Sequence, residues 1–229
     1  MKIGIIGAGE IGGSLARRLA ALRHTVSIAN SRGPDSLADI AAETGAIPVT
    51  VKEAARSGDI VFVAIPVCSV ANLPTDLFDG VDSRVIVVDT GNYYPRERDG
   101  RIDAIEKGAT ESQWTASRLG RPVLKALNNL PWRSLLDGGK PRGTPGRIAL
   151  PVAGDDAGQK AELIKLFDEL GFDGVDAGRL DESWRQQPAT PVYAADLDAA
   201  GVRRALSEAT PERRPEFRAS PNSTIGKPA

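Results

Sequence analysis

The chain has 229 residues and a formal net charge of -1, with 41% hydrophobic and 26% charged residues, a composition typical of a soluble globular protein. The near-neutral charge provides no electrostatic attraction for nucleic acid or an anionic membrane, so neither is an expected partner. One cysteine, Cys68, excludes an internal disulfide, and one histidine, His24, excludes a multi-histidine metal site. No apolar run is long enough to cross a bilayer, and the first strand starts at once without room for a signal peptide. We therefore expect a cytoplasmic protein with no bound metal.

Short apolar runs alternate with amphipathic stretches through the first half of the chain. The apolar runs predict strands over 2–6, 25–29, 47–49, 59–65, 84–89 and 122–127. Helical spacing predicts helices over 11–22, 35–44 and 51–56, and one of uncertain length within 67–78. Such alternation produces right-handed crossovers between parallel strands. The fold class is therefore α/β, and residues 1–128 are expected to form a Rossmann-type, doubly wound parallel sheet.

The second half changes character after a Gly-, Pro- and Arg-containing loop with one short helix at 132–136. Its patterns predict a strand over 147–153, a helix over 155–170 and a strand over 172–176. Residues 129–209 are therefore expected to form a small C-terminal α/β lobe. Residues 210–229 are Pro-rich and polar without apolar periodicity, which predicts a loose tail that could pack on a partner subunit.

A glycine-rich turn follows the first strand and opens the first helix. It reads Gly7-Ala8-Gly9-Glu10-Ile11-Gly12, and this placement in a strand–turn–helix unit is what makes the pattern informative. Gly7 permits the tight turn, Gly9 lets the backbone approach a pyrophosphate, and Gly12 lets the helix pack on the strand. The helix start then offers free amides to the phosphates, so the six residues predict a dinucleotide site.

The end of the second strand indicates which dinucleotide is bound. Enzymes that use NAD usually carry a carboxylate here for the ribose hydroxyls, whereas this chain has Asn30-Ser31-Arg32. Ser31 can donate a hydrogen bond to a 2'-phosphate, and Arg32 can pair with it and stack on the adenine. We therefore predict NADP(H) as the cofactor, although Arg32 could also be a solvated turn residue.

Three more strand ends should face the same crevice, because ligands of such sheets bind outside the carboxyl ends of the strands. Ala64, Ile65 and Pro66 follow the fourth strand and would pack against the nicotinamide or its ribose. Asn92 follows the fifth strand, and Asn128 follows the sixth, where it could bond the nicotinamide carboxamide or the acceptor. Each of these segments also fits an ordinary turn after a buried strand.

Taken together, the motifs resemble one known family over residues 1 to about 200. They are the glycine turn, Asn-Ser-Arg at 30–32, Ala-Ile-Pro at 64–66, Asp-Thr-Gly-Asn-Tyr-Tyr at 89–94 and Lys-Ala-Leu-Asn at 125–128. In this order they resemble the coenzyme F420-dependent NADP oxidoreductase family, and the chain is similar also to the oxidoreductase domain of the STEAP metalloreductases. Leu127 stands where the family has Phe.

The resemblance implies a reaction and its partners. It implies an NADP(H)-dependent oxidoreductase that passes a hydride between NADPH and a small-molecule acceptor, either the deazaflavin coenzyme F420 or a flavin. It also implies that the C-terminal lobe covers the acceptor ring, and we expect a homodimer. Hydride transfer between stacked rings needs little acid–base help, which fits a sequence without an evident catalytic dyad.

Other residues leave alternatives open. His24 is expected at the surface and Cys68 in packing, whereas Trp184 could stack on a ring or belong to the core. Lys125 could point inward and pair, or simply start a strand. Two other functions stay open: an imine or carbonyl reductase of the pyrroline-carboxylate reductase type, for which no proton donor is evident, and a non-catalytic NADP sensor.

Overall fold

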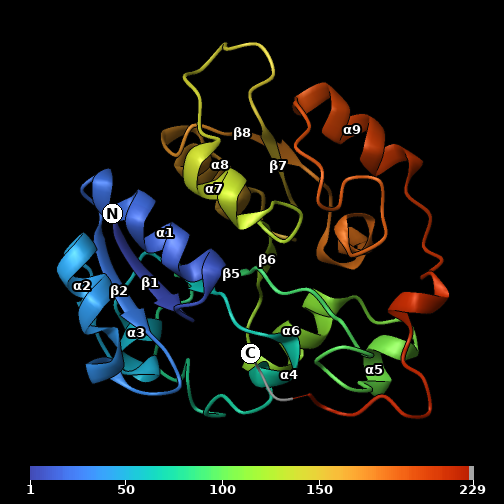
Figure 1. The fold of residues 1–229 in the computed structure, drawn as a ribbon, viewed down its shortest axis with the longest axis horizontal. Helices are drawn as coiled ribbons and strands as arrows, with labels where there is room; N and C mark the ends of the chain where they lie inside the picture. Colours follow the sequence, from blue (N-terminus) through green and yellow to red (C-terminus); the bar gives the residue numbers. More distant parts are fainter. Residues whose placement is uncertain (227–229) are drawn as a thin grey trace.

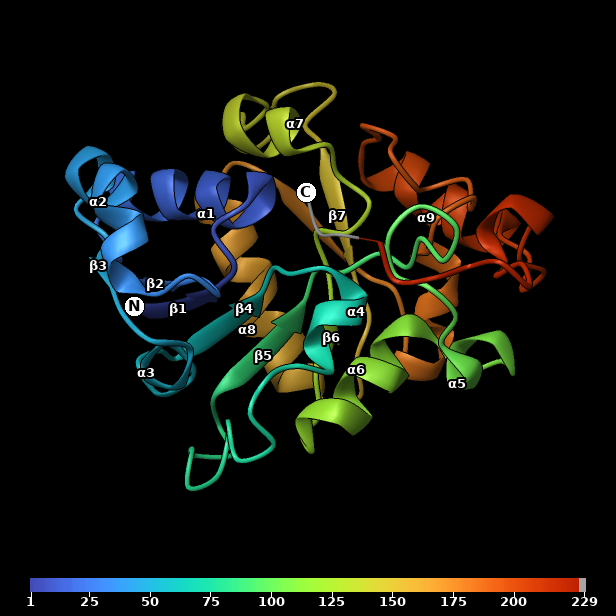
Figure 2. The same ribbon diagram turned by 60° about the horizontal axis from the view of Figure 1, so that its bottom comes forward.

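The computed structural model describes residues 1–226 and contains the doubly wound sheet that the sequence predicts (Figures 1 and 2). Six parallel strands lie in the order β3-β2-β1-β4-β5-β6. They are β1 (Lys2–Ile6), β2 (Thr25–Ala29), β3 (Ile47–Pro48), β4 (Ile60–Val63), β5 (Ile86–Asp89) and β6 (Leu124–Lys125). A second, two-stranded parallel sheet consists of β7 (Ala149–Val152) and β8 (Asp173–Asp176). Since the order reverses beside β1, the carboxyl ends of the central strands meet at one edge, which we call the carboxyl edge.

Helices cover both faces of the large sheet, and this explains why its strands are continuous apolar runs. On β1, Ile5 packs on one face with α1, whereas Ile6 packs on the other with α3. The α-helices are α1 (Glu10–Ala21), α2 (Ala38–Thr44), α3 (Val51–Arg56), α4 (Val67–Val70), α5 (Asp103–Glu106), α6 (Glu111–Leu119), α7 (Trp132–Asp137), α8 (Ala157–Glu169) and α9 (Ala199–Glu208). Three 3-10 helices are η1 (Pro34–Leu37), η2 (Leu180–Gln186) and η3 (Pro215–Phe217). No helix among residues 1–226 is long and apolar enough to span a membrane.

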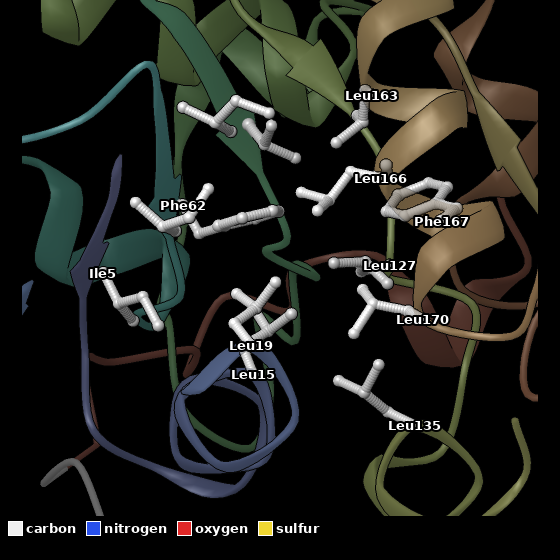
Figure 3. Close-up of a cluster of buried hydrophobic side chains, with 14 of the residues drawn as sticks. Ile5, Leu15, Leu19, Phe62, Leu127, Leu135, Leu163, Leu166, Phe167 and Leu170 are labelled. Carbon is white, nitrogen blue, oxygen red and sulfur yellow. The ribbon is translucent and has the colours of Figure 1, made fainter. Parts of the chain in front are cut away.

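The second half of the chain shares the core of the first. Figure 3 shows Phe62 of the sheet and Leu19 of α1 facing Leu166 and Phe167 of α8. All four side chains are fully buried. The small sheet also joins the large one, because Lys125 and Ala153 form an antiparallel bridge. The predicted boundary near residue 128 therefore separates segments of the chain but not separate hydrophobic cores.

Several local predictions differ from the structure. The helix expected within 67–78 is limited to the four residues of α4, and turns follow it. The helices α6 and α9 were not predicted. The start of α6 has a detectable signal, since Thr110 and Gln113 form a capping box.

The segment expected to be a loose tail instead lies along its own chain. The Arg96 side chain donates to the Arg218 carbonyl at 2.9 Å, and the Ala219 amide donates to Glu106 at 3.0 Å. Ile225 forms an antiparallel bridge with Asp99. The polar composition of this segment does not indicate a loose tail, because hydrogen bonds and one ion pair, between Arg213 and Glu111, hold it. Residues 227–229 of the predicted tail lie outside the described residues.

We predict that Leu166→Ala will lower the free energy of unfolding by about 2–5 kcal/mol, because it leaves a cavity where α8 meets the sheet. Urea unfolding should show one transition for both halves, since they share this core. Leu22→Ala is the control, because Leu22 is 40% exposed and should change stability by less than about 0.5 kcal/mol. Two separate transitions, or no loss in the Leu166 variant, would contradict the shared core.

Candidate functional site

The structure brings most of the sequence-predicted site residues to the carboxyl edge. The glycine turn follows β1, Ala64–Pro66 follows β4, and Asn92 and Asn128 follow β5 and β6. These strands are neighbours in the sheet, so their following residues lie side by side. Figure 2 shows β4, β5 and β6 side by side, with α7 and β7 of the second half above them in this view.

The three glycines of the first turn have different surroundings. Gly7 has a positive φ of 113°, and a Cβ there would lie 2.1 Å from the Ala64 carbonyl oxygen. A Cβ on Gly12 would lie 1.9 Å from the Gly7 carbonyl oxygen. A Cβ on Gly9, in contrast, would meet nothing within 4 Å. Gly7 and Gly12 are therefore required for packing, whereas Gly9 faces open space.

The start of α1 is available to an anion. Gly9 is the N-cap of this helix, and no side chain caps it. Gly9 and Glu10 are exposed, and Ala8 and Ile11 are half-buried. The first amides of a helix have no partners within the helix, and the helix dipole favours negative charge there. Backbone amides beside the open space at Gly9 fit a pyrophosphate.

The turn after β2 presents a hydroxyl and a guanidinium to solvent. The Asn30 side chain shapes this turn, because its Oδ1 accepts from the Arg32 amide at 2.9 Å and its Nδ2 donates to Ser36 Oγ at 2.9 Å. Ser31 and Arg32 are exposed, and Arg32 forms no ion pair with any of residues 1–226. Ser31 and Arg32 therefore remain available for a phosphate, whereas Asn30 holds the turn that carries them.

Asn92 and Asn128 bond to each other across the ends of β5 and β6. Asn92 Nδ2 donates to the Asn128 carbonyl at 2.8 Å, and Asn128 Nδ2 donates to Asn92 Oδ1 at 3.0 Å. Asn128 also exchanges two hydrogen bonds with Gln186 of η2, at 2.6 and 3.0 Å. Asn128 was predicted to contact the nicotinamide or the acceptor. In the structure its side chain is buried and joins η2 to the carboxyl edge.

The other side chains that the sequence singled out, Cys68, His24 and Trp184, pack against neighbouring residues. Cys68 is buried, and burial raises the pKa of its thiol, with a further contribution from Asp99. His24 was expected at the surface, but its ring is only 7% exposed and lies 3.1 Å from Glu169, away from the carboxyl edge. The Arg185 guanidinium carbon lies 4.4 Å from the centre of the Trp184 ring, on which it stacks. Trp184 also lines a cavity of about 410 Å³. No cluster of metal-ligating side chains occurs within the described residues.

Comparison with known proteins agrees with this geometry. Residues 2–93 match the family model described as NADP oxidoreductase coenzyme F420-dependent. The solved structure of the hypothetical protein SMa0349 from Sinorhizobium meliloti is 32% identical, with a TM-score of 0.74, over 86% of this chain and 95% of that one. The chain belongs to the coenzyme F420-dependent NADP oxidoreductase family.

Two further relatives limit what this membership implies. A structure from Arthrobacter sp. FB24, provisionally described as an F420-dependent NADP reductase, is 24% identical over 80% of this chain and 87% of that one, with a TM-score of 0.65. At that identity it supports the fold alone. The Escherichia coli K12 protein YjhV is 42% identical over 86 residues, which are 38% of this chain. The match spans only 56% of YjhV, just over half of its length.

This family member has a buried cluster of charged side chains just below the carboxyl edge. Lys125 Nζ lies 3.6 Å from both Asp89 Oδ2 and Glu111 Oε2, and Glu111 Oε1 lies 3.3 Å from Arg213 Nη2. Burial raises the pKa of Glu111, opposed by Lys125 and Arg213. Lys125 in an apolar strand indicates a buried acidic partner, but nothing local identifies Glu111 or Arg213. Sequence reasoning missed both residues.

Two tyrosine hydroxyls, from Tyr94 and Tyr193, meet in the folded chain, and sequence reasoning missed Tyr193 and this pairing. The Tyr94 and Tyr193 hydroxyls share a short hydrogen bond that joins the loop after β5 to the chain before α9. Arg98 stacks on the Tyr94 ring at 5.1 Å and donates to the Asn92 carbonyl at 2.6 Å. Burial and Tyr193 raise the pKa of Tyr94, so its hydroxyl stays protonated.

The glycine geometry predicts opposite outcomes for two substitutions in this protein. Gly12→Ala should cost about 1–3 kcal/mol of stability, because its methyl group overlaps the Gly7 carbonyl. Gly9→Ser should be as stable as the wild type to within about 0.5 kcal/mol, because it fills open space and serine is a good N-cap. Thermal unfolding measures both, and equal losses in the two variants would contradict the assignment of Gly9 to an open site.

Proposed function

We propose that the protein binds NADP(H) across the carboxyl edge and transfers a hydride between it and a flavin-like acceptor, either the deazaflavin coenzyme F420 or a flavin. The observation that carries the cofactor part is the pairing of an open glycine turn at Gly9 with an exposed Ser31 and Arg32 beside it. The family to which the chain belongs uses NADP(H). NADPH, when bound, supplies a hydride, which carries both electrons of the reduction.

Each part of the site then has one role. The amides of Gly9 and Glu10 bind the pyrophosphate, and Arg32 with Ser31 binds the 2'-phosphate. Ile65 and Pro66 form the apolar surface for the nicotinamide end. These residues orient the cofactor and exclude water, which is the contribution that hydride transfer requires of a protein.

The cofactor preference is testable by reversing one charge. Arg32→Asp should weaken NADPH binding by about 1–3 kcal/mol, because it removes a charge-assisted pair and adds repulsion. NADH binding should stay within about twofold, since NADH lacks the 2'-phosphate. Arg204→Asp on α9 controls for net charge and should leave both affinities unchanged. Equal losses for both nucleotides in the Arg32 variant would refute this role, and titration calorimetry measures all four values.

A second function is favoured by the tyrosine pair. Reduction of a carbonyl or imine adds a hydride to carbon and a proton to oxygen or nitrogen, so it needs a proton donor. The Tyr94 and Tyr193 hydroxyls share a short hydrogen bond that involves the loop after β5. Because a tyrosine hydroxyl can donate a proton, this pair is the candidate donor, and we keep an imine or carbonyl reductase as the alternative.

NADPH oxidation with different acceptors distinguishes the proposals. Turnover with coenzyme F420 or FMN, retained in Tyr193→Phe, supports the flavin-like acceptor. Turnover only with ketones or cyclic imines, reduced at least about 100-fold in Tyr193→Phe, supports the alternative. Tight NADPH binding without oxidation by any acceptor would instead support a non-catalytic sensor. Tyr93→Phe is the control for the loss of a tyrosine hydroxyl elsewhere in the protein, because the Tyr93 hydroxyl accepts a hydrogen bond from the Ile102 amide and does not belong to the pair.

A further inference from the structure

The buried charged cluster binds both backbone polar groups of one residue, Gly91, at the carboxyl edge. The Lys125 ammonium donates to the Gly91 carbonyl, and the Gly91 amide donates to Asp89 Oδ1 at 2.9 Å. Asp89 is held in turn by the Ser112 hydroxyl at 2.7 Å. The amide and the carbonyl of Gly91 are therefore bound by oppositely charged side chains from β5 and β6.

The position of the Gly91 backbone affects the residues that contact it. A Cβ on Gly91 would lie 3.0 Å from Val67 Cγ2, so this backbone packs closely against the segment after Pro66. The next residue is Asn92, which bonds Asn128 across the edge. A shift of Gly91 would move Asn92 and the surface beside Pro66 together.

Charge balance in this cluster depends on the far end of the chain. Lys125, Asp89 and Glu111 alone carry one positive and two negative formal charges in a site with almost no solvent exposure. Uncompensated buried charge costs several kcal/mol. Arg213, whose side chain is 17% exposed, supplies the second positive charge.

Arg213 is itself held in place. Its Nη2 donates to Gln187 Oε1 at 2.9 Å, and its guanidinium stacks on the Tyr93 ring at 5.2 Å. Glu111 Oε2, which faces Lys125, has no hydrogen-bond donor among residues 1–226. The Lys125 ammonium is therefore shared between the Gly91 carbonyl and a carboxylate oxygen that needs a partner.

We propose that Arg213 is a positioning residue that acts through Glu111 and Lys125 on Gly91. By neutralising Glu111, it leaves Lys125 on the Gly91 carbonyl, so docking of residues 210–226 orders the carboxyl edge. Without Arg213, Lys125 is the one cation among the described residues left to hold the Glu111 carboxylate ionised, so the ammonium moves toward that carboxylate and Gly91 loosens. The effect on cofactor affinity rests on the proposed NADPH function, whereas the effect on Gly91 does not.

Three variants separate charge balance from packing. Arg213→Gln removes the charge but keeps hydrogen-bonding groups, Arg213→Lys keeps the charge, and Arg213→Gln with Glu111→Gln removes both charges. Arg214→Gln is the matched control, because Arg214 is the exposed neighbour. Amide hydrogen exchange of the segment around Gly91, measured without nucleotide, is the primary measurement.

Exchange at Gly91 should be at least about tenfold faster in Arg213→Gln, and should be near wild type in Arg213→Lys, the double variant and the control. NADPH affinity should follow the same order, with a loss of about 5- to 150-fold in Arg213→Gln, the usual range for coupled sites. Wild-type exchange at Gly91 in Arg213→Gln would overturn the proposal. So would fast exchange that the double variant fails to restore.

The outcomes distinguish this inference from the proposed function. If the wild type binds no NADPH but Gly91 exchange follows the expected order, the proposed function fails and the positioning role stands. If Arg213→Gln does not fold, the double variant decides. If the double variant folds and its Gly91 amide exchanges slowly, the result supports the charge-balance role of Arg213. Fast exchange at Gly91 in the double variant overturns that role.

Discussion

The close contact between Gly7, Gly12 and the Ala64 carbonyl is the constraint on which the rest of the site depends. At both glycines a side chain would occupy the space of a backbone carbonyl, so α1 can approach β1 and β4 only when none is present. Gly9, which lies between these two glycines, is the N-cap of α1 and has open space where a side chain would project. A feature that is sterically required for packing thereby produces a place where backbone amides can meet an anion.

The second half of the chain completes this framework. Helix α8 contributes Leu166 and Phe167 to the core of the large sheet, and Gln186 bonds the end of β6 through Asn128. The final segment adds Arg213 to a buried cluster that would otherwise carry excess negative charge. Long-range apolar packing and charge compensation therefore both act on the strand ends, which makes the carboxyl edge a product of the entire described chain.

The sequence-based predictions succeeded where the interactions are local in the chain and missed those that join distant segments. Strand and helix patterns are local, and they predicted all six strands of the sheet and the α8 region. The helix predicted within residues 67–78 has only the four residues of α4, because the apolar residues that follow contact the core from turns instead of from a helix. Asn128 was singled out correctly as a residue of the edge, but its bonds to Asn92 and Gln186 depend on how distant segments meet.

By itself, the sequence determined the fold class, the glycine turn after the first strand and the lack of a carboxylate after the second. Each of these follows from steric or periodic rules that act within a few residues. Only the tertiary structure decided that Lys125 pairs with Glu111, that Arg213 returns to neutralise that pair, and that two tyrosine hydroxyls meet. A residue's type indicates that it needs a partner when buried, but the partner is selected by the packing of the complete chain.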